Sequence, residues 1–209
     1  MAAEGSLTLE RGLALLQAVA DAGGEAATIS ELAEAVGASR AAIYRLLTPL
    51  AARGLVRRDG SKVRLGVGVL RLAEQVLPQV REVARPILRE LADKAGATAH
   101  LSVAEGDQLQ SIAVAEPSRT DLHVAYRVGT RHPIGFGAAG KALGLRQGGR
   151  GWAVARGEVH RGTSGLAAPV RGVPGLRACV GVLSLGPINA EKAGPRVVEA
   201  ASALARALR

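Results

Sequence analysis

Residues 28–47, TISELAEAVGASRAAIYRLL, constrain the fold most strongly, because they predict two short helices joined by a tight turn. Thr28 and Glu31 have the spacing of a capping box, in which each side chain satisfies a free backbone N–H of the new helix. Gly37 ends that helix, and Ser39 can cap the next one. The stretch therefore predicts a helix-turn-helix unit.

The flanking segments complete a winged helix-turn-helix domain over residues 1–66. Before the unit, residues 6–24 carry leucine and valine at helical spacing and end on a Gly-Gly pair. After it, residues 55–58 and 62–65 predict two short strands joined by an Asp-Gly turn. The order of helices followed by a basic hairpin is typical of a winged helix-turn-helix.

Positive charge is concentrated in the second half of this domain. The chain has a net charge of +9, and seven basic residues but a single acid fall between Arg40 and Arg64. The preceding 39 residues hold one base and six acids. This change favours a nucleic-acid interface, with an ordinary solvated surface as the alternative. Because aromatic residues make up only 2% of the chain, stacking on bases is not the expected mode.

The third helix and the hairpin are expected to contact double-stranded DNA. A helix of this kind enters the major groove and presents its N-terminal residues to base edges, whereas the hairpin reaches the phosphate backbone. A small helical domain that packs on a partner protein is the alternative. The candidates on the helix are Ser39, as its cap, with Arg40, Ala41, Tyr44 and Arg45. The candidates on the hairpin are Arg57, Arg58 and Lys62.

Three prolines lie inside predicted helices, where each removes a hydrogen bond. Pro49 predicts a kink or changed helix geometry after Leu47. Pro78 and Pro86 predict a broken linker helix, with residues 67–85 as the linker and a second part that starts near Pro86. An apolar seam at heptad spacing runs through this region, either as a dimer contact or as intramolecular core. Its members are Leu70, Ala73, Leu77, Val80, Ala84, Ile87 and Leu91.

Residues 86–209 predict a second domain with a mainly antiparallel sheet and few helices, so the fold class is α+β. Short apolar runs divided by Gly, Asp and Pro are typical of strands. The expected strands cover residues 100–105, 110–116, 121–128, 165–172 and 176–187. The expected helices cover residues 138–145 and 196–209.

Residues 135–140 match the G-x-G-x-x-G pattern of a dinucleotide site, which leaves a nucleotide-cofactor enzyme as an alternative. That site needs a strand that ends at the first glycine, a long helix and a second parallel strand. Here Pro133 precedes the motif, and Gly144 breaks the helix that follows. Lys141 is followed by Ala142, so the motif is not a P-loop either. We therefore expect no enzyme, no catalytic residue and no cofactor.

The remaining signals indicate a cytoplasmic protein without a metal site. The four histidines are scattered, without cysteine or carboxylate at ligand spacing. A single cysteine, Cys179, fits a reducing compartment. No apolar run approaches the roughly 20 residues that span a membrane, and we expect no membrane association.

The motifs taken together resemble the IclR family of bacterial transcriptional regulators. The resemblance rests on SLTLERGLALLQAVA, TISELAEAVGASRAAIYRLL, ARPILRELADKAGATAHLSVAEG, GTRHPIGFGAAGKALG, AAPVRG and GVLSLGPI, in this order. It implies a sequence-specific DNA-binding regulator with a linker helix and a GAF-like effector-binding and oligomerisation domain. The implied partners are an operator, a small-molecule effector such as an organic or aromatic acid, and further copies of the chain, as a homodimer or a dimer of dimers.

The resemblance also implies an effector pocket lined by Ala138, Ala139, Gly140, Gly165, Leu183 and Leu185. Residues 137–140 open a helix, so free backbone N–H groups there would receive a carboxylate. The chain departs from the family pattern where Gly165, Leu183 and Leu185 replace polar residues, and it is apparently shortened between residues 141 and 152. A degenerate, ligand-free dimerisation domain is therefore a further alternative.

Overall fold

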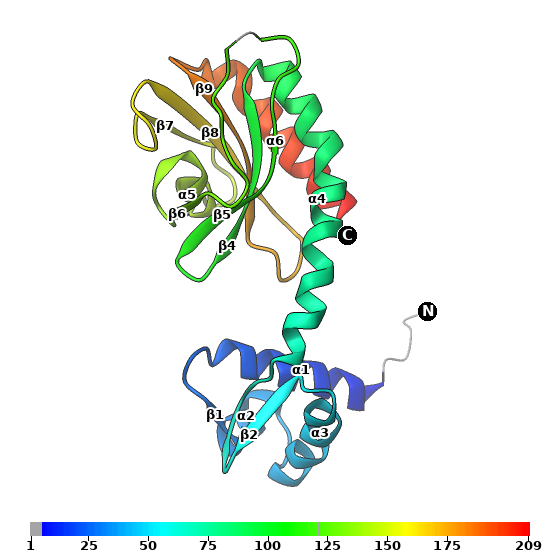
Figure 1. Cartoon of the computed structure of the whole chain (residues 1–209). Helices are drawn as coiled ribbons and strands as arrows, with labels where there is room; N and C mark the ends of the chain where they lie inside the picture. The colour runs from blue at the N-terminus through cyan, green and yellow to red at the C-terminus, as the bar shows by residue number, and fades with distance from the viewer. Residues whose placement is uncertain (1–5, 121) are drawn as a thin grey trace. The chain divides into compact units, whose positions relative to one another are not determined.

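A computed structural model describes residues 6–120 and 122–209 of the chain (Figure 1). The chain divides into two compact units, one that extends to Val76 and one over Leu77–Arg209. We describe each unit by itself.

The first unit is a winged helix-turn-helix, as predicted. Its elements are α1 (Leu7–Asp21), β1 (Ala27–Thr28), α2 (Ile29–Val36), α3 (Arg40–Ala52), β2 (Val56–Asp59), β3 (Lys62–Leu65) and the start of α4 (Gly68–Ala95). The hairpin β2–β3 gains a third strand because β1 pairs with β3. Leu15, Ile29, Leu32 and Ile43 are buried where the three helices meet the sheet.

The predicted caps explain where the helices begin. Thr28 Oγ1 accepts a hydrogen bond from Glu31 N at 3.2 Å, and the Glu31 carboxylate accepts one from Thr28 N at 2.7 Å. Gly37 ends α2 with φ of 64°, a left-handed conformation that suits glycine. The expected change of geometry after Leu47 is wrong, because α3 remains α-helical through Pro49 to Ala52.

The helix α4 is continuous, so the predicted break at Pro78 and Pro86 is wrong. Both prolines are exposed, and the carbonyl groups that they leave without an amide partner can bind water. Apolar side chains on the other side of the helix, such as Leu88, hold it by packing. From Leu77 onward the heptad seam is intramolecular core: Val80, Ala84 and Leu91 are buried, and Leu77 and Ile87 are partly buried. Leu70 and Ala73 are exposed.

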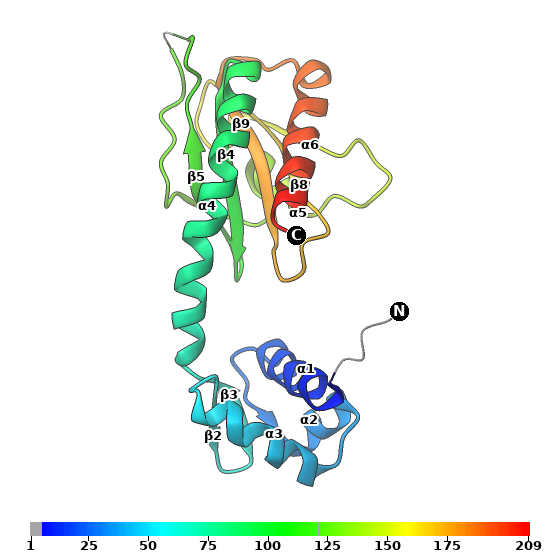
Figure 2. The same cartoon turned by 90° about the vertical axis from the view of Figure 1, so that its right-hand side faces the viewer.

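The second unit is built on a six-stranded antiparallel sheet with the order β6-β5-β4-β9-β8-β7. Its strands are β4 (Thr98–Glu105), β5 (Gln108–Ala115), β6 (Arg131–Pro133), β7 (Ala153–Arg156), β8 (Thr163–Val170) and β9 (Ala178–Leu185). Figures 1 and 2 show α4 and α6 (Ala190–Ala207) on one face of the sheet and α5 (Gly137–Leu143) on the other. This arrangement confirms the α+β class.

Strand alternation decides which side chains face which layer. On β9, Val180 and Val182 join the core under α4 and α6, whereas Cys179 packs on the side of α5. On β4, Leu101 belongs to the core under α4 and α6, so its neighbour His100 faces α5. The face that carries α5 is therefore the one that presents polar and aromatic groups.

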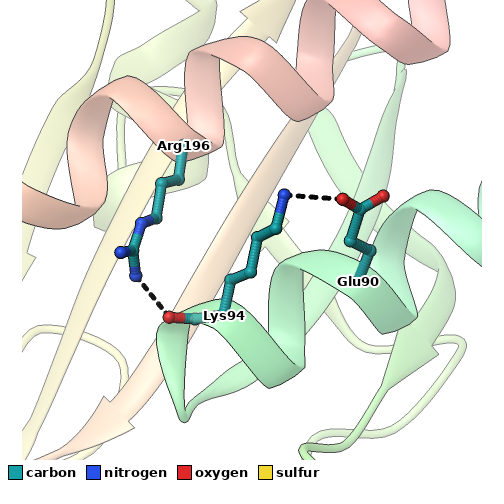
Figure 3. Close-up of polar contacts among 3 residues, drawn as sticks. All are labelled: Glu90, Lys94 and Arg196. Atoms are coloured by element: carbon teal, nitrogen blue, oxygen red, sulfur yellow. Dashed lines mark hydrogen bonds and ion pairs between the residues drawn. The ribbon is translucent and has the colours of Figure 1, made fainter.

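Polar contacts tie the end of α4 to α6 (Figure 3). Arg196 on α6 donates a hydrogen bond to the carbonyl oxygen of Lys94, which lies in the last turn of α4 and lacks a helical partner. Lys94 Nζ also pairs with Glu90 Oε1 at 2.6 Å. The Arg196 hydrogen bond links α6 to the end of α4, whereas the Lys94–Glu90 pair lies within α4.

Several expected boundaries in this unit are wrong. Residues 122–128 form no strand, and Asp121 lies outside the described residues. Val124 is held instead by a hydrogen bond from Thr98 Oγ1 to its carbonyl oxygen at 2.7 Å. The strands β6 and β7 were not predicted as strands, and α6 begins at Ala190 because Asn189 caps it. Within the described part of the chain, no helix is long and apolar enough to cross a membrane.

Candidate functional site

The helix α3 presents four of its candidate residues on one exposed surface. Ser39 caps it, with Oγ accepting a hydrogen bond from Ala42 N at 3.2 Å. Ile43 and Leu47 are buried, which turns the opposite side of the helix outward. Arg40, Ala41, Tyr44 and Arg45 are exposed there. Thr48, one turn further, is also exposed and was not predicted. The structure thus brings the five predicted α3 residues together at the start of the helix.

The three predicted cations of the hairpin do not form one row. Cross-strand partners share a face of a sheet, and β2 pairs Arg57 with Arg64 and Asp59 with Lys62. Arg58 lies opposite Val63 and so points to the other face. The Arg58 guanidinium carbon lies 5.0 Å from the centroid of the Tyr44 ring, which places Arg58 beside α3. Arg57 and Lys62 lie on the opposite face together with Arg64.

The second candidate site is a pocket between the sheet and α5, with a cavity volume of about 30 Å³. Four of the six predicted effector residues line it, namely Ala138, Ala139, Gly165 and Leu183. Gly140 and Leu185 do not. A Cβ at Gly140 would lie 2.8 Å from Gly135 N, so this glycine packs against the preceding turn. Leu185 ends β9 and is 51% exposed.

Two glycines shape the floor of the pocket. A Cβ at Gly165 would lie 3.2 Å from Ala138 Cβ, so the glycine lets α5 approach β8 closely. A Cβ at Gly181 would lie 2.7 Å from His100 Nε2, so this glycine leaves room for the imidazole opposite it in the ladder. The apolar floor therefore accommodates a buried histidine.

An unpredicted row of rings lines one side of the pocket. The ring centroids of His100 and Tyr126 are 5.2 Å apart, those of Tyr126 and His132 are 6.2 Å apart, and Phe136 follows His132 at 6.2 Å. The four histidines are scattered in the sequence, so their spacing does not predict this row. The usable signal was the strand alternation that turns His100 away from the larger core. In a chain with 2% aromatic residues, the presence of two of them here marks the site.

Burial keeps the two histidines uncharged. It lowers the pKa of His100 to about 4, with a smaller contribution from His132. It also lowers the pKa of His132, again as the main cause, with His160 nearby. His100 Nδ1 lies 3.2 Å from Ser102 Oγ. His132 Nε2 is buried and has no hydrogen-bond partner among the described residues. Near pH 7 both rings can donate a hydrogen bond to a ligand or accept one from it, but they offer it no positive charge.

The first amide of α5 is already bound by a side chain, so this one of the amides expected at residues 137–140 is not free for an effector carboxylate. Gly137 N donates to Glu158 Oε2 at 3.1 Å, and Lys141 pairs with Glu158 Oε1. The hydrogen bond from Lys141 is the main reason that the pKa of the Glu158 carboxyl lies below its usual value. The Glu158 carboxylate therefore occupies the first of the amides expected to receive an effector carboxylate.

The glycine motif forms a turn rather than a dinucleotide site. Gly135 and Gly137 have φ of 91° and 64°, which bends the chain from β6 into the seven-residue α5. A short strand does precede the motif, contrary to expectation, but β6 and β7 both pair antiparallel with their neighbours.

Burial raises the pKa of Cys179 to about 12. Within residues 6–120 and 122–209, no group of three His, Cys, Asp or Glu could hold a metal ion.

Relatives of known sequence match both units. The model of the IclR helix-turn-helix domain matches residues 8–60, and that of the bacterial transcriptional regulator IclR C-terminal region matches residues 76–147. The acetate operon repressor of Salmonella typhimurium is 31% identical over 65% of this chain and 51% of its own. The regulator BhcR of Paracoccus denitrificans is 31% identical over 66% of this chain and 50% of its own. The chain thus spans about half the length of these curated relatives.

Solved structures share the fold along the whole chain. An IclR transcriptional regulator from Alicyclobacillus acidocaldarius has a TM-score of 0.56 at 20% identity, covering 98% of this chain and 100% of its own. An IclR homologue from Microbacterium hydrocarbonoxydans, complexed with 4-hydroxybenzoate, has a TM-score of 0.54 at 18% identity, covering 97% of this chain and 99% of its own. With models of one family matching both units in the order of the fold, the chain belongs to the IclR family of bacterial transcriptional regulators.

Proposed function

We propose that the protein is a sequence-specific DNA-binding transcriptional regulator rather than an enzyme. The observation that carries the proposal is the exposed start of α3, where Arg40, Tyr44 and Arg45 project beside a capped helix N-terminus. Neither the capped start of α3 nor the rest of the helix contains an acidic residue. A surface of this shape and charge fits the major groove of DNA.

The candidate residues take different roles in this proposal. Tyr44 and Arg45 contact base edges, with Ala41 allowing close approach, and Arg40 contacts a phosphate near the helix start. Arg58, stacked on Tyr44, belongs to the same surface as α3. Arg57 and Lys62 lie on the other face of the hairpin and contact backbone phosphates beside the groove.

We also propose that the second unit senses a small metabolite; the family resemblance implies an organic or aromatic acid. The pocket below α5 supports a sensor, because it combines apolar walls with a few polar groups. The Microbacterium homologue is complexed with 4-hydroxybenzoate, which supports an aromatic ligand. The small volume of the cavity supports the alternative function, in which the second unit is a dimerisation domain that binds no ligand.

A homodimer, alone or as a dimer of dimers, is the proposed assembly. The first unit exposes several large apolar side chains on α1 and on the start of α4. They are Leu7, Leu9, Leu13, Leu70, Leu72 and Val76, each at least half exposed. Covering them with a second copy would bury apolar area and would bring two α3 helices to a pair of half-sites.

Selection of bound fragments from the source genome tests the proposed function. The wild-type chain should enrich fragments that share one short motif, with two-fold symmetry if a dimer binds. The variant Arg45→Ala should lose that enrichment. Arg146→Ala, which removes an exposed arginine from a loop of the second unit, should retain it. Enrichment of no common motif by the wild type, or equal enrichment by Arg45→Ala, would refute the proposed role of α3.

A further inference from the structure

The pocket below α5 offers no free positive charge to a ligand. Among the described residues that line it there is neither lysine nor arginine, and the charged side chain on its wall is the carboxylate of Glu158. The nearest cation on α5, Lys141, is already paired with that carboxylate. Because burial keeps the imidazoles of His100 and His132 neutral, they do not supply the missing charge.

The pocket does offer uncharged hydrogen bonding beside apolar walls. His132 Nε2 is buried without a partner among the described residues, and an unsatisfied buried polar atom favours a ligand that can bond to it. Phe136, Leu183 and the methyl group of Ala138 provide apolar contact. A ligand with a hydroxyl or carbonyl group on an otherwise apolar framework matches these pocket groups.

A ligand of that kind requires the pocket to enlarge. About 30 Å³ has room for one or two water molecules, whereas a cavity that holds benzene has about 150 Å³. The loop between β7 and β8 carries Glu158 and Val159 on the pocket wall. The contacts of Glu158 with Lys141 and Gly137 N hold this loop against α5. Enlargement that keeps these contacts leaves Lys141 paired with Glu158, so the ligand meets no free cation.

We propose that this pocket takes a small uncharged aromatic molecule with at least one hydroxyl or carbonyl group, in preference to a carboxylate anion. The inference rests on the proposed sensor function and replaces the acid that the family resemblance implies with an uncharged ligand. A carboxylate would either displace Glu158 from Lys141, exchanging one anion for another, or remain buried without a counter-charge. An unpaired buried charge is strongly unfavourable, whereas an ester or alcohol avoids that cost.

Matched ligand pairs test the proposal. Binding of 4-hydroxybenzoate and its methyl ester, and of benzoate and its methyl ester, is measured by calorimetry on the full chain near neutral pH. Each ester should bind at least about tenfold more tightly than its acid, since the acid alone must bury a charge. An acid that binds as tightly as its ester, or the absence of binding by all four compounds, would overturn the proposal.

Variants separate this explanation from a general loss of structure. Glu158→Gln removes the negative charge and should narrow the ratio between acid and ester affinities several-fold. Glu191→Gln, which removes an ion-paired glutamate on α6, should leave that ratio unchanged. An unchanged ratio in Glu158→Gln would contradict the assigned role of this carboxylate. DNA binding of the same preparations is measured separately, so that failure of the regulator proposal is distinguished from failure of the ligand assignment.

Discussion

The buried His100 should make the second unit sensitive to mild acid. In an unfolded chain the imidazole takes up a proton near its ordinary pKa of 6.5, whereas burial lowers the folded pKa to about 4. Between these values the unfolded state binds the proton and the folded state does not. Stability is therefore fully present above about pH 6.5 and is lost as the pH falls toward 4.

The magnitude follows from the two pKa values. Their difference of about 2.5 corresponds to about 3 kcal/mol in the free energy of unfolding when the loss is complete. About 2 kcal/mol of this should be lost between about pH 7 and about pH 5. The variant His100→Gln cannot take up a proton at this site. Its free energy of unfolding should therefore not show this loss of about 2 kcal/mol between the two pH values, even if the variant is less stable at neutral pH.

The fluorescence of Trp152 provides the assay, because it is the single tryptophan of the chain and lies in the second unit. Urea unfolding of the wild type, of His100→Gln and of His160→Gln, which removes an exposed histidine, is followed at both pH values. The wild type and His160→Gln should lose about 2 kcal/mol more than His100→Gln. Equal losses in all three proteins would refute the argument that His100 is held neutral.

Three further predictions concern packing, capping and the hairpin. Gly194→Ala should destabilise the second unit by ~1–3 kcal/mol in the same assay, because the new Cβ would overlap the Trp152 ring. The control Gly149→Ala should have little effect, because its Cβ would meet open space. Thr28→Ala should lower the stability of the first unit by ~1 kcal/mol, measured by thermal loss of helical circular dichroism, because α2 loses its cap. Lys62→Ala should weaken binding to every duplex alike and reduce the slope of log affinity against log salt by ~0.9; a selective loss for one sequence would contradict its role as a phosphate contact.

Sequence analysis predicted the first unit well because its signals are local. The capping box at Thr28, the glycine at position 37 and the Asp-Gly turn of the hairpin each depend on residues within a few positions of one another. The same reasoning put Arg57 and Arg58 in one group of phosphate contacts. Consecutive residues of a strand point to opposite faces, and this separates them in the structure.

The second unit was harder to predict because its decisive contacts join distant residues. Pro78 and Pro86 stay inside α4 because packing of that helix on the sheet outweighs the lost hydrogen bonds. The pocket side chains come from separate segments: His100 lies on β4, whereas Tyr126 lies in the segment between β5 and β6. The contact of Glu158 with Gly137, across 21 residues, was likewise not visible as a pattern.

The salt dependence of DNA binding tests the central claim most directly. Fluorescence anisotropy is measured with a selected duplex and a scrambled duplex of the same composition over a range of salt concentrations. The wild type should prefer the selected duplex and lose affinity steeply as salt rises, and Arg45→Ala should retain a steep slope but lose most of the preference. Wild-type affinity that is independent of salt, or equal for both duplexes, would contradict the assignment of α3 and the hairpin as a sequence-reading DNA interface.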